Sequence, residues 1–169
     1  MISTTETAYE AFIQNTLTPL WGKVPNAALS LFAADCSTAL ELPLAGSPVS
    51  AGFPSPAEDY IEMALDLNKE LIKNPEATFY ARVRGHSMKD ACIQDGDLLV
   101  IDKAQEPKDG CVAVCAIDGE FTLKRLAVEK DGIYLMPAND EFKPIKITEE
   151  NDFLVWGIVA YVVHQVRCK

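Results

Sequence analysis

Positive charge is scarce in this chain. Its 169 residues include 15 Lys and Arg against 25 Asp and Glu, which gives a formal net charge of −10 at pH 7. Affinity for duplex DNA comes mostly from Lys and Arg that neutralise phosphates, so direct binding to duplex DNA is disfavoured and a protein partner is the better expectation. Residues 1–41 carry one basic side chain, Lys23, and so lack the basic recognition helix of a helix-turn-helix DNA reader.

The sequence also lacks a long hydrophobic run. The longest, residues 155–163, is too short for a membrane-spanning helix, and its β-branched and aromatic residues indicate a buried strand. The first residues contain no apolar block, and no Lys or Arg precedes Lys23, so a secretory signal is not expected. We therefore expect a cytoplasmic protein without membrane contact.

Cysteine is present in an odd number, which argues against a disulfide framework in a protein of a reducing compartment. The five are Cys36, Cys92, Cys111, Cys115 and Cys168. On an expected strand, Cys111 and Cys115 would lie on one face about 13 Å apart, which is beyond disulfide reach. Both are better interpreted as small buried hydrophobic residues. No group of His, Cys or carboxylate residues has the spacing of a zinc site, so we expect neither a metal nor another cofactor.

Proline and glycine are concentrated in residues 42–56. This composition disfavours a helix interior and a central strand, and it predicts an accessible, extended arm. The sequence Ser55-Pro56-Ala57-Glu58 has the form of a capping box. It predicts a helix over about residues 56–73 that ends before Asn74-Pro75.

From about residue 78 onward, short runs rich in β-branched and aromatic residues alternate with Gly, Asp and Asn. The candidate strands are 78–84, 97–102, 110–117, 120–127, 132–136, 142–147 and 153–166. Asp118-Gly119 is the kind of pair that a two-residue hairpin turn favours. These patterns predict a single compact, mostly β domain over about residues 78–169. It is preceded by a partly helical N-terminal arm, with short helices expected at about 5–15 and 26–34.

Two residues of the β-rich region have the chemistry of a nucleophile and its base. Ser87 follows one expected strand directly, and Lys124 lies inside another. A serine hydroxyl is a poor nucleophile until a base removes its proton, and a neutral lysine can be that base. For Lys124 to be neutral, its pKa must fall from about 10.4 to near neutrality, which costs about 4 kcal/mol and requires burial without a carboxylate partner. Its same-face neighbours Thr122 and Leu126 suit such a setting, and Thr122 could orient the amine.

Taken singly, a lysine on a strand usually faces water and a serine after glycine usually makes a turn. Other nucleophile systems nevertheless fit less well. Gly85-His86-Ser87-Met88-Lys89 lacks the second glycine of a Gly-x-Ser-x-Gly nucleophile elbow. The His86 side chain should point away from the adjacent Ser87 on extended chain, so we do not expect it to be that serine's base. His164 is expected to pack in the last strand or to lie at the surface.

Four blocks of sequence, in order, carry a family resemblance. They are Gly52-Phe53-Pro54-Ser55-Pro56-Ala57-Glu58-Asp59-Tyr60, Gly85-His86-Ser87-Met88, Asp95-Gly96-Asp97-Leu98-Leu99 and Asp118-Gly119-Glu120-Phe121-Thr122-Leu123-Lys124. In order and spacing the chain resembles the LexA/UmuD family of self-cleaving serine peptidases from about Val49 to the C-terminus. Residues 1 to about 41 lie outside the resemblance.

The resemblance implies a role for each matching residue. Ser87 would be the nucleophile and Lys124 the base, with the backbone N–H groups of His86 and Ser87 as oxyanion donors and Met88 at the entrance. The cleavage position falls on Ala51-Gly52, where a small residue beside glycine lets the backbone approach Ser87 closely.

Cleavage there would release residues 1–51 as the N-terminal arm and leave 52–169 as the active form. The same pair could also be an ordinary flexible linker. Restraint before cleavage could come from holding the arm away from Ser87 or from keeping Lys124 charged.

Partners also follow from the resemblance. It implies a homodimer in the SOS response to DNA damage, with self-cleavage stimulated by the RecA filament on single-stranded DNA. The trimmed form would join the UmuC subunit of the error-prone translesion DNA polymerase V. Cleavage within one chain and cleavage between dimer partners are equally compatible with the sequence.

Two alternatives remain open. The first keeps the peptidase fold but makes the N-terminal segment a binding module for another protein, acting in damage-dependent transcriptional control. The second is a leader or signal peptidase, which also uses serine and lysine, but the sequence shows no membrane anchor.

Overall fold

In the part of the chain that the structure describes, the larger sheet has eight antiparallel strands. The structure is a computed structural model and describes residues 31–34, 36, 38–45 and 61–166. The order across this sheet is β1-β4-β5-β10-β6-β7-β8-β9. Its strands are β1 (Leu31–Ala33), β4 (Thr78–Arg82), β5 (Leu98–Asp102), β6 (Val112–Ile117), β7 (Glu120–Glu129), β8 (Gly132–Met136), β9 (Ile145–Lys146) and β10 (Phe153–Val163).

The mostly β fold predicted from the sequence is confirmed. Each of the seven candidate strands overlaps one strand of the structure, and most boundaries agree within a few residues. The largest difference is at 142–147, where only Ile145–Lys146 pairs with β8. The hairpin predicted at Asp118-Gly119 is also confirmed, because Ile117 pairs with Glu120 and both turn residues have positive φ, 49° and 85°. Positive φ at both central residues is what a type I′ turn requires.

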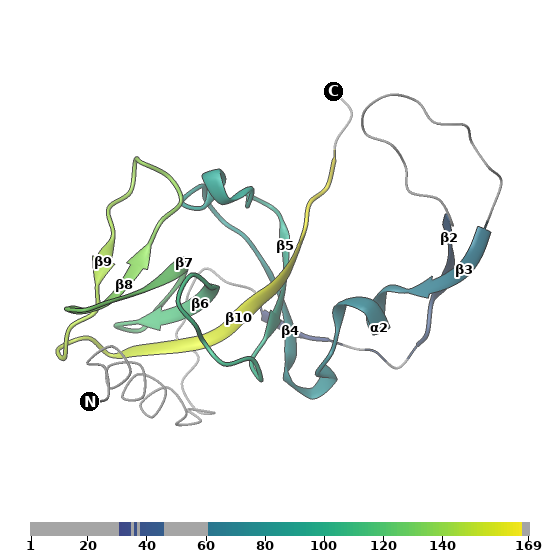
Figure 1. The fold of residues 1–169 in the computed structure, drawn as a ribbon, viewed down its shortest axis with the longest axis horizontal. Coiled ribbons are helices and arrows are strands. Elements are labelled where there is room, and N and C mark those ends of the chain that lie inside the picture. The colour runs from purple at the N-terminus through teal and green to yellow at the C-terminus, as the bar shows by residue number, and fades with distance from the viewer. Residues whose placement is uncertain (1–30, 35, 37, 46–60, 167–169) are drawn as a thin grey trace.

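Strand β10 joins the two halves of the sheet (Figure 1). It pairs with β6 along its first half and with β5 along its second half, and the register shifts between Val155 and Gly157 and again between Val159 and Tyr161. Gly157 stands at the first shift, where a Cβ atom would meet the Cγ2 atom of Ile101 at 2.6 Å. The absence of a side chain therefore permits the close approach of β10 to β5.

The core consists of two clusters of buried side chains. One contains Ala113, Cys115, Leu126, Leu135, Val155 and Ile158. The other contains Ala81, Met88, Ile93, Leu99, Ile101 and Val114. Cys111 and Cys115 are both free thiols: Cys115 is fully buried, as predicted, whereas Cys111 is only partly buried and packs against the first cluster.

The helix predicted over about 56–73 is wrong for residues 61–66. Strand β3 (Ile61–Asp66) pairs there with β2 (Glu41–Ala45), and these two strands form a separate antiparallel ribbon. Helix α2 is limited to Leu67–Leu71, where Asp66 caps it by accepting a hydrogen bond of 3.0 Å from the Asn68 amide. Pairing with β2 satisfies the backbone of 61–66 and overrides the helical propensity of the local sequence. Residues 46–60, which include the predicted capping box, lie outside the described residues.

The N-terminal helix predicted over 26–34 is likewise wrong for Leu31–Ala33. These residues form β1 and pair with β4, with Phe32 opposite Tyr80. The edge of β4 supplies these residues with backbone partners from a distant part of the sequence, and this pairing overrides the local helical pattern. The first predicted helix, 5–15, and residues 26–30 lie outside the described residues.

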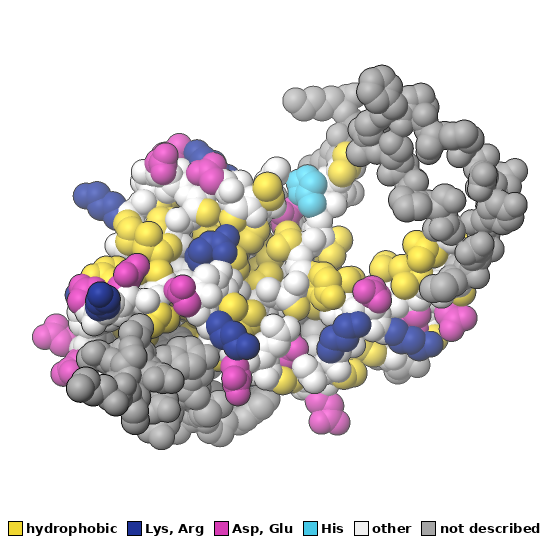
Figure 2. All heavy atoms as spheres, in the orientation of Figure 1, with side chains coloured by type: hydrophobic (Ala, Val, Ile, Leu, Met, Phe, Trp, Pro, Cys, Tyr) yellow, Lys and Arg dark blue, Asp and Glu magenta, His cyan; other side chains and the backbone are white. Residues whose placement is uncertain are grey.

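The β2–β3 ribbon extends away from the larger sheet (Figure 1). Leucine side chains are exposed just before and along β2 and at the start of α2, in a part of the molecule where Figure 2 shows hydrophobic side chains at the surface. They are Leu40, Leu42, Leu44 and Leu67. None of the helices in the described part of the chain is long and apolar enough to cross a membrane.

The close approach at Gly157 gives the first prediction. Gly157→Ala should lower the free energy of unfolding by about 1–3 kcal/mol, because the added methyl group overlaps the buried Ile101 side chain. Urea denaturation measures the change. The control is Gly119→Asn at the hairpin turn, where a Cβ atom meets nothing within 4 Å and asparagine accepts a positive φ. A Gly157→Ala protein as stable as the Gly119→Asn protein would contradict the packing argument.

Candidate active site

Ser87 lies in the loop that follows β4, and residues 95–97 hold the start of this loop. The Gly85 amide donates a hydrogen bond of 2.7 Å to the Asp95 carboxylate, and Gly85 has a φ of 94°, which favours glycine. Val83 pairs with the same segment, because its amide donates to the Asp97 carbonyl and its carbonyl accepts from the Gly96 amide, both at 2.9 Å. The Asp95-Gly96-Asp97 block of the sequence thus shapes the chain that presents Ser87.

The other end of the loop rests on the segment after β8. The Ser87 carbonyl accepts a hydrogen bond of 2.9 Å from the Ala138 amide, and the Asp90 amide donates to the Ala138 carbonyl at 2.9 Å. The side chain of Asn139 donates to the His86 carbonyl, also at 2.9 Å. Ser87 is therefore fixed by contacts on both sides.

Lys124 reaches Ser87 from strand β7. Its side chain is buried, with the residue 7% exposed, and its Nζ atom lies 3.3 Å from Ser87 Oγ. The amine also donates to Thr122 Oγ1 at 2.8 Å and to the Leu123 carbonyl at 3.0 Å. The orienting contact from Thr122, which the sequence analysis suggested, is confirmed.

Burial lowers the pKa of Lys124, while the neighbouring Cys115 opposes this with a smaller effect. Lys124 takes part in none of the salt bridges found among the described residues. Burial also raises the pKa of the Cys115 thiol to about 12, so this neighbour is uncharged at neutral pH. A neutral amine can donate to Thr122 and Leu123 and still turn its lone pair toward the Ser87 hydroxyl.

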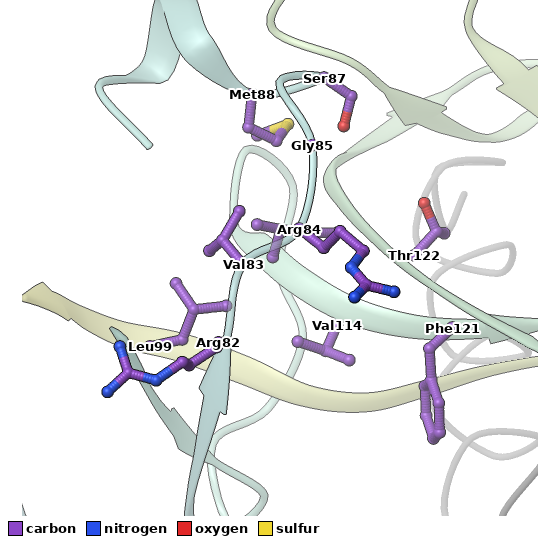
Figure 3. A pocket seen from close by; sticks show the side chains of 11 residues that line it. Arg82, Val83, Arg84, Gly85, Ser87, Met88, Leu99, Val114, Phe121 and Thr122 are labelled. Carbon is purple, nitrogen blue, oxygen red and sulfur yellow. The ribbon is translucent and has the colours of Figure 1, made fainter. Parts of the chain in front are cut away.

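A cavity of about 140 Å³ opens beside Ser87. Its walls are mostly apolar, and in Figure 3 the Ser87 side chain points toward the space bounded by these walls. The apolar residues are Val83, Met88, Leu99, Val114, Phe121 and Leu123. Met88, predicted at the entrance, is a buried part of this lining. A hollow of this kind can hold a small apolar side chain next to the serine.

The two histidines have other partners. His86 Nε2 lies 3.5 Å from the Glu141 carboxylate, and its ring packs edge-on against Phe142. His164 Nδ1 lies 2.6 Å from the buried Asp97 carboxylate. Both contacts agree with the expectation that neither histidine serves as the base for Ser87.

The predicted oxyanion donors are the backbone amides of His86 and Ser87. Within the described part of the chain, neither amide donates a hydrogen bond to another residue. Unused N–H groups beside a nucleophile are what a developing oxyanion needs. No sequence pattern identifies Asn139 and Ala138, which anchor the carbonyls of this turn, because contacts to a distant backbone leave no local signal.

The predicted scissile pair, Ala51-Gly52, lies outside the described residues. The flanking chain is described, since β2 ends at Ala45 and β3 begins at Ile61. The candidate cleavage site thus belongs to the segment that connects the two strands of the ribbon.

A serine hydroxyl in contact with a buried lysine that has no carboxylate partner among the described residues defines the site as a candidate serine–lysine hydrolase centre. The family described as Peptidase S24-like matches residues 43–160. The chain belongs to this family of peptidases, and the resemblance to LexA and UmuD proteins is confirmed.

Three relatives illustrate the similarity. Protein ImpA of Salmonella typhimurium is 44% identical over 125 residues, which cover 74% of this chain and 85% of the relative. Protein SamA of Salmonella typhimurium strain LT2 is also 44% identical, over 74% of this chain and 86% of the relative. Protein MucA of Escherichia coli is 40% identical over 114 residues, which cover 67% of this chain and 77% of the relative.

The burial of Lys124 predicts a pH-dependent cost to stability. Below its lowered pKa the folded protein must bury a charge, and between that pKa and the ordinary value of 10.5 the unfolded chain binds more protons, so stability rises with pH. Lys124→Met should therefore raise the Tm at pH 7, by about 2–4 °C for each kcal/mol regained. The gain should shrink as the pH approaches 10.5.

Calorimetry in a Ser87→Ala background measures this difference without self-cleavage. Lys130→Met, at an exposed position after β7, is the matched control and should leave the Tm nearly unchanged. A Tm gain for Lys124→Met that does not vary with pH would show that the buried amine is not its source.

Proposed function

We propose that this protein is a self-cleaving serine peptidase that hydrolyses its own Ala51-Gly52 bond. The observation that carries the proposal is the 3.3 Å contact between Ser87 Oγ and the buried Nζ atom of Lys124, within a domain of a peptidase family. The apolar cavity beside Ser87 suits a small residue such as Ala51.

In the proposed reaction, neutral Lys124 takes the Ser87 proton while Oγ attacks the Ala51 carbonyl carbon. The carbonyl oxygen becomes an oxyanion that accepts hydrogen bonds from the His86 and Ser87 amides. Lys124 then gives its proton to the Gly52 nitrogen as the C–N bond breaks, which leaves residues 1–51 as an ester on Ser87. Water, deprotonated by Lys124, hydrolyses that ester and regenerates the hydroxyl.

The geometry of the ribbon supports a form of regulation in which cleavage depends on bringing the Ala51-Gly52 bond to Ser87. Strands β2 and β3 flank the segment that contains Ala51-Gly52, and they project away from the larger sheet, whose strand β4 leads into the Ser87 loop (Figure 1). The exposed leucines of the ribbon offer a surface for a second copy, so we propose a homodimer in which cleavage occurs within or between chains.

The similarity to UmuD-like proteins supports a role in the SOS response. We propose that the RecA filament on single-stranded DNA stimulates the cleavage by favouring the cleavable state. The product 52–169 then joins the UmuC subunit of error-prone DNA polymerase V for translesion synthesis in the cytoplasm.

A second candidate function is damage-dependent transcriptional control through the N-terminal segment. Strand β1 favours it, because residues 31–33 pair with the edge of β4 and thus attach this segment to the peptidase domain. In this role the segment would bind another protein, since it carries almost no basic residues.

Intact-mass spectrometry tests the proposed peptidase. After incubation at about pH 10, where even an ordinary lysine approaches half-neutrality, the wild-type protein should yield the mass of residues 52–169. Ser87→Ala and Lys124→Ala should remain uncut because the nucleophile or the base is missing. Cleavage of either variant at this bond would refute the assigned dyad.

The cleavage position has its own test. Ala51→Lys should abolish the product 52–169, because a long charged side chain does not fit the small apolar cavity. Ala51→Ser retains a small side chain and should still be cut. If the wild-type protein stays intact alone, RecA with single-stranded DNA and a nucleotide cofactor is added, and an intact chain there would favour the binding role.

The cleavage rate should rise with pH as Lys124 loses its proton. Because burial lowers the pKa of this amine, the midpoint of the rise should lie below 10.5. Rate constants measured by gel densitometry between about pH 6 and pH 11 give this profile. A rate that does not change with pH would exclude Lys124 as the base.

A further inference from the structure

Asn139 is a buried polar residue whose side chain contacts the nucleophile loop at the carbonyl that precedes Ser87. It belongs to the turn of residues 138–142, in which the Phe142 amide donates to the Asn139 carbonyl at 3.1 Å. The residue is only 4% exposed. Burial of an amide side chain is costly unless its groups are hydrogen-bonded, so we expect both its oxygen and its nitrogen to have partners.

Both ends of the Asn139 side chain are used. Its Oδ1 atom accepts a hydrogen bond of 3.0 Å from the Glu141 amide, and its Nδ2 atom donates to the His86 carbonyl at 2.9 Å. The Glu141 amide can only donate and the His86 carbonyl can only accept. The orientation of the Asn139 amide is therefore determined by its partners.

The contact with the His86 carbonyl fixes the direction of the Ser87 N–H. The described chain contains no cis peptide bonds, so the C=O of His86 and the N–H of Ser87 point in opposite directions within their shared peptide plane. Asn139, at 2.9 Å, and the Lys89 amide, with a longer bond of 3.3 Å, both hold this carbonyl, so the N–H must face the opposite direction. That N–H donates no hydrogen bond within the described residues.

We propose that Asn139 is a positioning residue for the oxyanion hole. It acts through the His86 carbonyl to aim the Ser87 N–H at the oxygen that becomes negative during attack, and it touches no reacting atom itself. A donor that is aimed in advance stabilises the charge without reorganisation during the reaction. This inference rests on the proposed self-cleavage and adds a residue to its machinery.

Kinetics of self-cleavage test the proposal through Asn139→Leu, which keeps the side-chain volume but cannot donate. Misaiming the Ser87 N–H should lower the plateau rate constant by about 10- to 100-fold. The pH midpoint should not move, since the contacts of Lys124 with Ser87, Thr122 and Leu123 do not involve residue 139. An unchanged rate overturns the proposal, and so does a midpoint shift that accounts for the loss.

The matched control is Glu141→Gln in the same turn. It weakens the exposed ion pairs with His86 and Lys89 but keeps the backbone amide that binds Asn139, so its rate should equal that of the wild type. A loss for Glu141→Gln as large as for Asn139→Leu would assign the effect to the turn as a whole and overturn the proposal.

A second readout separates aiming of the amide from general disorder of the loop. In a Ser87→Cys background, iodoacetamide alkylates the thiolate by displacement of iodide, a step that forms no oxyanion. Mass spectrometry of tryptic peptide 85–89 follows this reaction at the intended cysteine. Asn139→Leu should leave the alkylation rate within about twofold of the Ser87→Cys background, whereas an equally large fall in both reactions overturns the proposal.

Failure of the inference and failure of the proposed function give different results. If the wild-type protein cleaves, Ser87→Ala does not, and Asn139→Leu cleaves at the wild-type rate, only the role of Asn139 is refuted. If the wild-type protein is never cut, both are refuted. Circular dichroism checks that Asn139→Leu is folded, and Asn139→Ala replaces it if it is not.

Discussion

The contact between a buried lysine amine and a serine hydroxyl is the interaction on which the rest of this structure depends. An amine in that position is unfavourable while it carries a charge, because burial removes its water and no carboxylate of the described residues compensates. Thr122 and the Leu123 carbonyl satisfy its N–H groups without holding a proton on it. The buried amine thus lowers the free energy of unfolding at neutral pH, and in return it can act as a base that accepts the serine proton.

The sheet brings together two residues that are far apart in sequence. Ser87 follows β4 and Lys124 lies on β7, and these strands belong to the two halves that β10 joins. The position of β10 between β5 and β6 therefore sets the separation of nucleophile and base, and Gly157 allows β10 to lie close to β5. On the far side of the loop, Ala138 and Asn139 complete the frame after β8. Small shifts in any of these elements would change the 3.3 Å distance between Lys124 Nζ and Ser87 Oγ.

Local patterns in the sequence identified what local interactions determine. Alternating β-rich runs and the Asp118-Gly119 pair gave the strands and the hairpin, and the apolar neighbours of Lys124 indicated its burial. The helix expected over 61–66 failed because β2 offers backbone partners from a distance in sequence, as β4 does for 31–33. Asn139 was not predicted for a related reason, since its proposed role depends on the His86 carbonyl, 53 positions away.

The arrangement of the groups suggests where control of the proposed reaction resides. Ser87 and Lys124 are already in contact, and the His86 and Ser87 amides have no other acceptor in the described part of the chain. A partner would therefore gain little by assembling the catalytic groups. It could act by delivering the bond, because a two-stranded ribbon with exposed leucines is only marginally stable alone and gains from any surface that covers it. Suppose that a partner binds the conformation in which the ribbon places Ala51-Gly52 at Ser87 more tightly than the extended conformation. It would then raise the population of the cleavable conformation, with no change at Ser87 or Lys124.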